Sequence, residues 1–192
     1  MRHSNKLLFL TFLFFTSGYC QNLITNPDFD TGILGWADYG NASTTTSWNG
    51  QDGALSNGSL EISDTINNGG VVRAYWETAI PVVSGEKYYA QVMSKVIGSS
   101  EAQAGYLWID WLDENQNYVG HYSTLNLWGV FDSWEPILGV LTVPDGMKYA
   151  RFHVGLATND TGSPNPSTVL FDDIVFIEDL IFSNSFEEIV AP

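Results

Sequence analysis

Short runs of alternating apolar and polar residues, separated by turns rich in Gly, Asn and Asp, recur along most of this chain. Apolar residues at helical spacing are nearly absent. The runs predict strands over Ser59–Ile62, Val71–Ile80, Lys87–Val96, Gly105–Leu112, Trp134–Val143, Lys148–Ala157 and Thr168–Phe176. So many short strands at this spacing predict an all-β fold, a β-sandwich of the jelly-roll kind, rather than a parallel sheet covered by helices.

The N-terminal stretch has the pattern of an export signal. Arg2 and Lys6 precede the apolar run Leu7–Phe15, and small residues follow it. We therefore expect a signal peptide over 1–20, cleaved after Cys20 or after Gly18, and a secreted, extracellular or periplasmic protein. The expected organisation is one domain over 21–178 and a C-terminal tail over 179–192.

A single cysteine, Cys20, excludes an internal disulfide, so an exported domain needs another way to join its ends. A lipid anchor at Cys20 is the less favoured alternative, because Tyr19 stands where such a signal requires a small residue. No later segment approaches the roughly 20 apolar residues of a membrane span.

The chain is acidic: seven Lys and Arg stand against 22 Asp and Glu, giving a net charge of −15. This balance argues against partners such as nucleic acid or anionic membrane surfaces. It suits neutral ligands, cationic ligands or metal ions, although acidity that serves solubility alone explains the composition equally well. We expect a monomer.

Alternation in two of the predicted strands assigns side chains to opposite faces of a sheet. One set is apolar and comprises Leu107, Ile109, Trp111, Ala150, Phe152, Val154 and Leu156. The other set mixes aromatic and polar side chains and comprises Tyr106, Trp108, Asp110, Tyr149, Arg151 and His153. Such a mixed surface suits ligand binding, but aromatic residues also stabilise cross-strand pairs, so a purely structural role stays open.

Four stretches, in this order, resemble the carbohydrate-binding modules of the family 4, 9 and 22 type, which are jelly rolls of the galactose-binding-like superfamily. They are "NLITNPDFDTGILGW" (Asn22–Trp36), "NGSLEI" (Asn57–Ile62), "IPVVSGEKYYAQV" (Ile80–Val92) and "VLFDDIVF" (Val169–Phe176). No single motif is strong. Their order and spacing make the likeness specific, and it spans nearly the whole predicted domain.

The resemblance implies a structural Ca²⁺ that joins the two ends of the domain. Its ligands by position would be Asp28, the main-chain carbonyl of Gly58, and Asp172. Calcium prefers six to eight hard oxygen ligands and accepts carboxylates, carbonyls and water together. In the alternative interpretation, the aspartates of the first stretch cap a turn and those of "FDDI" lie in solvent.

The resemblance also implies a cleft that binds polysaccharide. Tyr39 and Tyr118, the latter in a loop, match the tyrosines that flank the family's cleft, and His153 stands at a polar position where Gln is more usual. Trp108 stands where the family can have Arg. The expected binding residues are Tyr39, Tyr106, Trp108, Asp110, Tyr118, Arg151 and His153. The abundance of aromatic residues indicates a β-glucan or xylan-like polymer.

Two other functions remain open at this stage. A glycoside hydrolase could pair Asp110 with Glu77, but the sequence does not show the separation that such a pair requires, and some sandwich-fold polysaccharide lyases keep a related possibility. An extracellular adhesive or structural protein could keep the fold and bind a protein instead. We expect a non-catalytic binding module, because related folds bind more often than they cleave.

Overall fold

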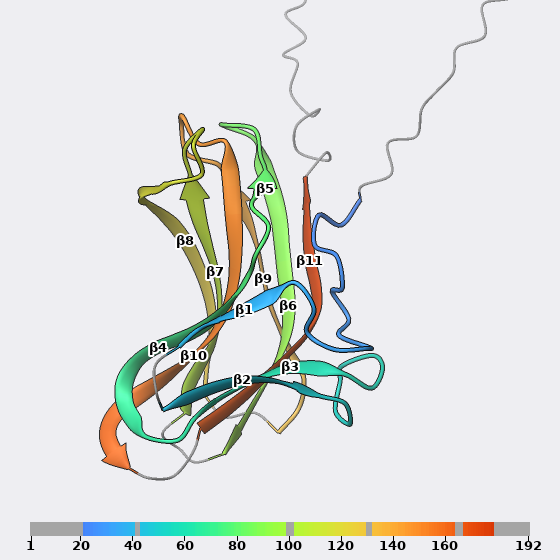
Figure 1. The fold of residues 1–192 in the computed structure, drawn as a ribbon, viewed down its shortest axis with the longest axis vertical. Helices are drawn as coiled ribbons and strands as arrows, with labels where there is room; N and C mark the ends of the chain where they lie inside the picture. Colours follow the sequence, from blue (N-terminus) through green and yellow to red (C-terminus); the bar gives the residue numbers. More distant parts are fainter. Residues whose placement is uncertain (1–20, 41–42, 99–101, 130–131, 164–166, 179–192) are drawn as a thin grey trace, which may run out of the picture.

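The computed structural model describes residues 21–178, apart from 41–42, 99–101, 130–131 and 164–166. The predicted signal peptide (1–20) and tail (179–192) lie outside the described residues. The described part is all-β and forms two antiparallel sheets, which confirms the predicted sandwich (Figure 1). It has no helix long and apolar enough to cross a bilayer.

We call the two layers the front sheet and the back sheet. The front sheet runs in the order β1 (Trp36–Tyr39), β4 (Asn67–Trp76), β10 (Tyr149–Ser163), β7 (Ala102–Leu112) and β8 (Tyr118–Trp128), with β5 (Ile80–Pro81) also paired to β10. The back sheet runs in the order β2 (Thr44–Asn49), β3 (Ser59–Asp64), β11 (Ser167–Glu178), β6 (Lys87–Gly98) and β9 (Glu135–Thr142). In the upper half of Figure 1, β7, β8 and β10 stand to the left of β6 and of the end of β11.

The predicted strands all exist, but the structure adds to them and divides one. The predicted strand over 71–80 is two strands, β4 and β5. Strands β1, β2 and β8 were not predicted, and Tyr118, expected in a loop, is the first residue of β8. The side chains of β8 are exposed or half-buried throughout, as in an edge strand with little apolar burial, so its sequence lacks a clear alternation.

The core lies between the two sheets and follows the predicted alternation. All seven residues assigned to the apolar face of β7 and β10 are buried. Aromatic rings from both ends of the chain meet here: Trp36 lies 5.9 Å from Trp76 and 6.3 Å from Phe152, centroid to centroid. Burial of large apolar side chains of this kind is the main source of stability for a domain without disulfides.

Within the opening stretch, Phe29 (0% exposed) and Trp36 (7%) are core residues, whereas Leu34 is 88% exposed. Leu34 therefore does not anchor the stretch in the core. It precedes Gly35, whose φ of +88° turns the chain, and a Cβ at Gly35 would lie 2.3 Å from the ring of Trp76. The turn that seats Trp36 in the core therefore directs Leu34 outward.

The same opening stretch is hydrogen-bonded along β11, the last strand. The Asn22 side chain donates to the Ile174 carbonyl (2.7 Å) and accepts from the Phe176 N–H (3.0 Å). Main-chain bonds join Leu23 to Phe176 (2.9 Å) and Ile174 to Pro27 (3.1 Å). We call this junction the clasp; it consists of Asn22–Trp36, β11 and the 53–58 loop. It joins the two ends of the described chain without a covalent link.

Candidate functional site

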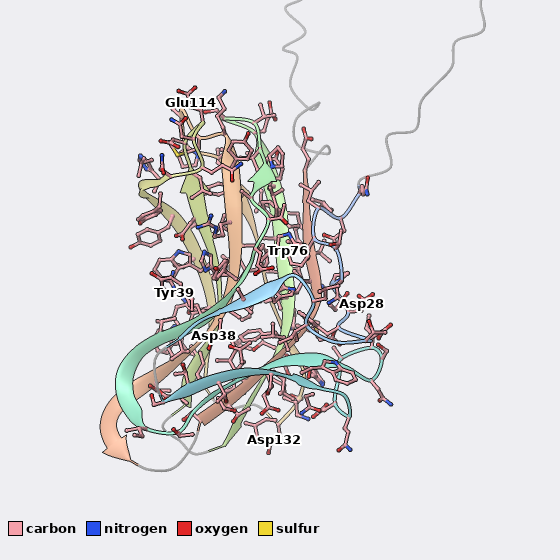
Figure 2. The ribbon with its side chains drawn as sticks, in the orientation of Figure 1. Asp28, Asp38, Tyr39, Trp76, Glu114 and Asp132 are labelled. Carbon is pink, nitrogen blue, oxygen red and sulfur yellow. The ribbon has the colours of Figure 1, made fainter. Side chains whose placement is uncertain are left out.

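A cleft of about 290 Å³ opens on the outer face of the front sheet. Its lining residues come from four strands of that sheet and from the start of the fifth: Tyr39, Arg73, Tyr75, Trp108, Asp110, Tyr118, Arg151 and His153. Figure 2 labels Tyr39 at the left of the molecule.

Strand register brings these residues together from distant parts of the chain. Tyr75 pairs with His153, and His153 pairs with Trp108, so three residues on three strands lie side by side. In the next row, Tyr39 pairs with Arg73 and Arg73 with Gly155. A Cβ at Gly155 would lie 3.0 Å from Cγ of Arg73 and 2.6 Å from a main-chain oxygen, so only glycine leaves room for Arg73 there.

Six of the seven predicted binding residues line the cleft: Tyr39, Trp108, Asp110, Tyr118, Arg151 and His153. Tyr106 lies on the same face but outside the cleft, with its ring 6.1 Å from that of Trp128. Arg73 and Tyr75 also line the cleft and were not predicted. The alternation in "VVRAYW", which places them between three buried residues, is the signal that assigns them to this face.

Rings and guanidinium groups stack on one another inside the cleft. The Arg73 Cζ lies 5.0 Å from the Tyr39 ring centroid and 4.6 Å from that of Trp108. The Trp108 ring in turn stacks on that of Tyr122, on the neighbouring strand β8, at a centroid distance of 4.7 Å. The Arg151 Cζ lies 5.7 Å from the Tyr75 ring. Such cation–π contacts hold both guanidinium groups against aromatic faces.

The floor of the cleft holds a buried polar pair. His153 is 3% exposed, and its Nε2 lies 3.0 Å from Oδ2 of Asp110. Oδ1 of Asp110 accepts a 2.7 Å hydrogen bond from Nε1 of Trp108. Nδ1 of His153 is buried and lacks a hydrogen-bond partner among the described residues, so the floor has an unused polar atom.

These contacts fix the charges of the pair. Burial lowers the pKa of His153, and the opposing effect of Asp110 does not restore it, so the imidazole is neutral at pH 7. Burial alone would raise the pKa of Asp110, but contacts with His153 and Trp108 and the charge of Arg73 outweigh it and lower that pKa. Asp110 is therefore an anion at neutral pH.

Asp110 is the one carboxylate among the lining residues, all of which are described. Glu77, the partner considered for a glycosidase, follows β4, is exposed, and does not line the cleft. The structure thus does not bring the two carboxylates of that hypothesis together in the cleft.

The predicted metal residues lie in the clasp, away from the cleft; Figure 2 shows Asp28 and Tyr39 on opposite sides of the view. Asp172 is 1% exposed, and its Oδ2 accepts a 2.6 Å bond from the Ala54 N–H. Its Oδ1 is buried without a hydrogen-bond partner. Burial, together with the charge of Asp28, raises the pKa of Asp172 to about 6.

The backbone of Gly58 packs against the same turn. Its φ is +143°, and a Cβ there would lie 2.4 Å from the carbonyl oxygen of Phe29, next to Asp28. Burial, followed by the charges of Asp30 and Asp173, raises the pKa of Asp28. The orphaned oxygen of Asp172 and this crowding of carboxylates fit a hard cation. Among the described residues, however, no three His, Cys, Asp or Glu side chains form a metal cluster, so carbonyls and water would have to complete the shell.

No protein-family model matches the chain, and a search of curated proteins finds no match. Solved structures do match it. The "Family 16 Carbohydrate Binding Module-2" has a TM-score of 0.58 and 16% identity over 82% of this chain and 100% of its own. The CBM22-1 xylan-binding domain from Paenibacillus barcinonensis Xyn10C has a TM-score of 0.57 and 14% identity over 83% of this chain and 95% of its own.

The enzymatically active domain of tailspike protein 4 from bacteriophage CBA120 matches with a TM-score of 0.62 and 14% identity over 82% of this chain. This chain spans only 21% of that domain. At such identities the likeness concerns the fold. The protein therefore has the β-sandwich fold of carbohydrate-binding modules.

Proposed function

We propose that the protein is a secreted, monomeric and non-catalytic carbohydrate-binding module, and that its cleft binds a polysaccharide of the β-glucan or xylan type. The observation that carries the proposal is the composition of the cleft. Four aromatic side chains and four planar polar side chains converge there on one face of the front sheet.

Sugar rings suit such a surface. The C–H faces of a pyranose pack on aromatic rings, while its hydroxyl rim needs planar donors and acceptors. Tyr39 (61% exposed) and Tyr118 (50%) have accessible rings for packing. Asp110 and the neutral His153 offer acceptor and donor positions on the floor.

The fold neighbours add support of a second kind. One of them is described as a xylan-binding domain, and 95% of that domain is covered by the match to this chain. A glycoside hydrolase would need a second carboxylate on the other side of the scissile bond, and the cleft lining contains one carboxylate. A binding role therefore accounts for the lining better than a catalytic one.

We further propose that the clasp holds a structural Ca²⁺ on Asp28, Asp172 and the Gly58 carbonyl. An ion there would neutralise the buried carboxylate of Asp172, whose Oδ1 has no partner of its own. Its effect would be to bind the opening turn to the last strand. An ion that binds the folded state and not the unfolded state would stabilise the domain.

Affinity electrophoresis on soluble β-glucans, xylans and mannans, with calcium and with chelator, tests the proposal. We expect one β-glucan or xylan to retard the protein, with no reducing ends released. Replacing Trp108 and Tyr118 by Ala together should abolish the retardation. Release of sugar would instead support an enzyme, and no retardation by any polymer would leave adhesion to a protein as the better hypothesis.

A further inference from the structure

We propose that the cleft recognises the carboxylate of a uronate sugar within its polysaccharide, and that Arg73 and Arg151 bind it. This inference rests on the proposed function, because it names the class of sugar that the same cleft prefers. A uronate-bearing polymer is chemically distinct from the neutral glucans and xylans considered above.

The distribution of positive charge in the chain points to this ligand. The chain has three arginines, Arg2, Arg73 and Arg151, and the first lies in the predicted signal peptide. Both of the others line one cleft of about 290 Å³, in a chain whose net charge is −15. A cleft that served only neutral hydroxyl groups would not require the arginines of so acidic a domain to gather there.

Neither arginine forms a salt bridge with a carboxylate of the described residues, although the charge of Arg73 acts on Asp110. Salt bridges that the structure does form include Lys95–Asp52 (2.8 Å) and His153–Asp110 (3.0 Å). Nε of Arg151 is buried and has no hydrogen-bond partner among these residues. Asp110 already accepts a bond from Trp108 and contacts His153, so its charge is shared with the floor of the cleft.

The stacking geometry leaves the arginines able to bind an anion. The Arg73 Cζ lies over the rings of Tyr39 and Trp108, at 5.0 and 4.6 Å from their centroids. A cation–π contact does not use the N–H donors of the guanidinium as hydrogen-bond donors. A guanidinium held between two rings has lost much of its side-chain entropy before a carboxylate binds, and its paired donors match the two oxygens.

The local charge of the cleft also favours an anionic ligand, despite the overall acidity of the chain. Two arginines face a single aspartate in the cleft, and the neighbouring imidazole of His153 is neutral. The acidic residues elsewhere act through salt water, where the screening length is about 8 Å at physiological ionic strength. The cleft therefore presents a net positive site to a bound sugar.

The test compares polymers that differ only in their carboxylates. Glucuronoxylan, polygalacturonate and alginate are each used as the native polymer and after carboxyl reduction, which converts uronates to neutral sugars on the same backbone. For at least one pair, the wild-type protein should bind the native polymer about 10-fold more tightly or better, as a charge-assisted bond of about 1.5 to 3 kcal/mol would give. Raising the salt concentration should weaken that preference.

Two cleft variants and one control test whether the preference for the native polymer arises in the cleft. In Arg73→Gln the ratio of native to reduced affinity should fall close to one, and Arg151→Gln should lower it less. Lys148→Gln removes the same unit charge from an exposed position outside the cleft and should leave the ratio unchanged. Thermal unfolding checks that each variant is folded.

Equal affinity for native and reduced polymers would overturn the uronate inference and leave the proposed function standing. So would a Lys148→Gln effect as large as that of Arg73→Gln, because the preference would then be general charge attraction. If no polymer bound in either form, nor any neutral glucan or xylan, both the inference and the proposed function would be wrong.

Discussion

The clasp and the cleft both gather polar groups from distant parts of the chain, but they use them differently. In the clasp, Asn22 and the opening turn are hydrogen-bonded to β11, and a buried carboxylate, Asp172, lies among main-chain donors. In the cleft, Arg73 and Arg151 stack on rings and have no carboxylate partner among the described salt bridges. Polar groups that are used by the chain itself stabilise the fold, and polar groups that remain unused are available to a ligand.

This contrast predicts that variants of the two regions separate stability from affinity. The largest effect should come from Phe29→Ala in the clasp, because Phe29 is fully buried. We expect the free energy of unfolding to fall by about 3 to 5 kcal/mol. Affinity for polysaccharide should be unchanged at temperatures where the variant is folded.

Urea unfolding followed by tryptophan fluorescence measures the first quantity and affinity electrophoresis the second. Leu34→Ala is the matched control, because Leu34 lies five residues further along the same turn and is 88% exposed. It should change stability by less than about 0.5 kcal/mol. A loss of affinity in Phe29→Ala without a loss of stability would contradict the division between the regions.

The converse change is made in the cleft. Trp108→Ala combined with Tyr118→Ala should weaken polysaccharide binding by about 2 kcal/mol or more, roughly 30-fold, as expected for aromatic residues at the centre of a binding surface. The control is Trp128→Ala, which removes an exposed ring (59%) of the same sheet outside the cleft. Isothermal titration should find near-wild-type affinity for the control; equal losses in both would place the binding surface elsewhere.

The clasp should also make stability depend on pH when metal is removed. The pKa of Asp172 is raised from 3.8 to about 6 in the folded protein, so the folded state holds this proton more tightly than the unfolded state. Its contribution to stability is therefore complete below about pH 4 and is lost as the pH rises through about 6, at up to about 1.4 kcal/mol per pH unit.

Urea unfolding of EDTA-treated protein between pH 4 and pH 7 measures this slope. Asp172→Asn should flatten it, whereas Asp173→Asn, which changes the adjacent and less buried carboxylate, should keep it. Identical slopes in wild type and Asp172→Asn would show that this carboxyl is not the group responsible.

Calcium should reverse the same effect at pH 7. Because ion binding requires the ionised carboxylate, added Ca²⁺ should raise the unfolding temperature of the wild type but not that of Asp172→Asn. Differential scanning calorimetry with and without calcium makes the comparison, and Mg²⁺ serves as the control ion. An equal rise in both proteins would contradict the proposed ligand set.

The smallest effect is expected for Tyr106→Ala. Tyr106 lies on the face of the cleft but outside it, with its ring against Trp128. We expect the affinity for polysaccharide to change less than about twofold, which titration calorimetry can resolve. A loss as large as that of the Trp108 and Tyr118 variant would extend the binding surface toward the edge of the sheet.

Much of the fold could be predicted because a strand with one buried face alternates apolar and polar residues along its sequence. β7 and the first part of β10 face the core on one side, and their alternation placed Phe152 inside and Trp108 outside. Strand β8 could not be found in this way. It is an edge strand whose side chains are exposed or half-buried on both faces, so apolar and polar residues need not alternate along it.

The cleft was predicted less completely than the fold, because it depends on which strands are neighbours. Arg73 and Tyr75 could be given a face from "VVRAYW", but that their strand lies beside β10, opposite His153, follows from the register of a long-range pair. Likewise, Tyr106 has the alternation of a binding residue, and only the position of Trp128 on β8 shows that its ring is otherwise engaged.

Two indole N–H groups report on the two regions and give the most direct test of the binding claim. Nε1 of Trp108 donates to Asp110 in the cleft (2.7 Å), and Nε1 of Trp48 donates to the Phe29 carbonyl in the clasp (2.7 Å). Their proton NMR signals can be assigned with Trp108→Phe and Trp48→Phe and followed during titration with oligosaccharides of the polymer that retards the protein. We expect the Trp108 signal to shift until the protein is saturated while the Trp48 signal stays in place. A shift of the Trp48 signal with a stationary Trp108 signal would contradict it.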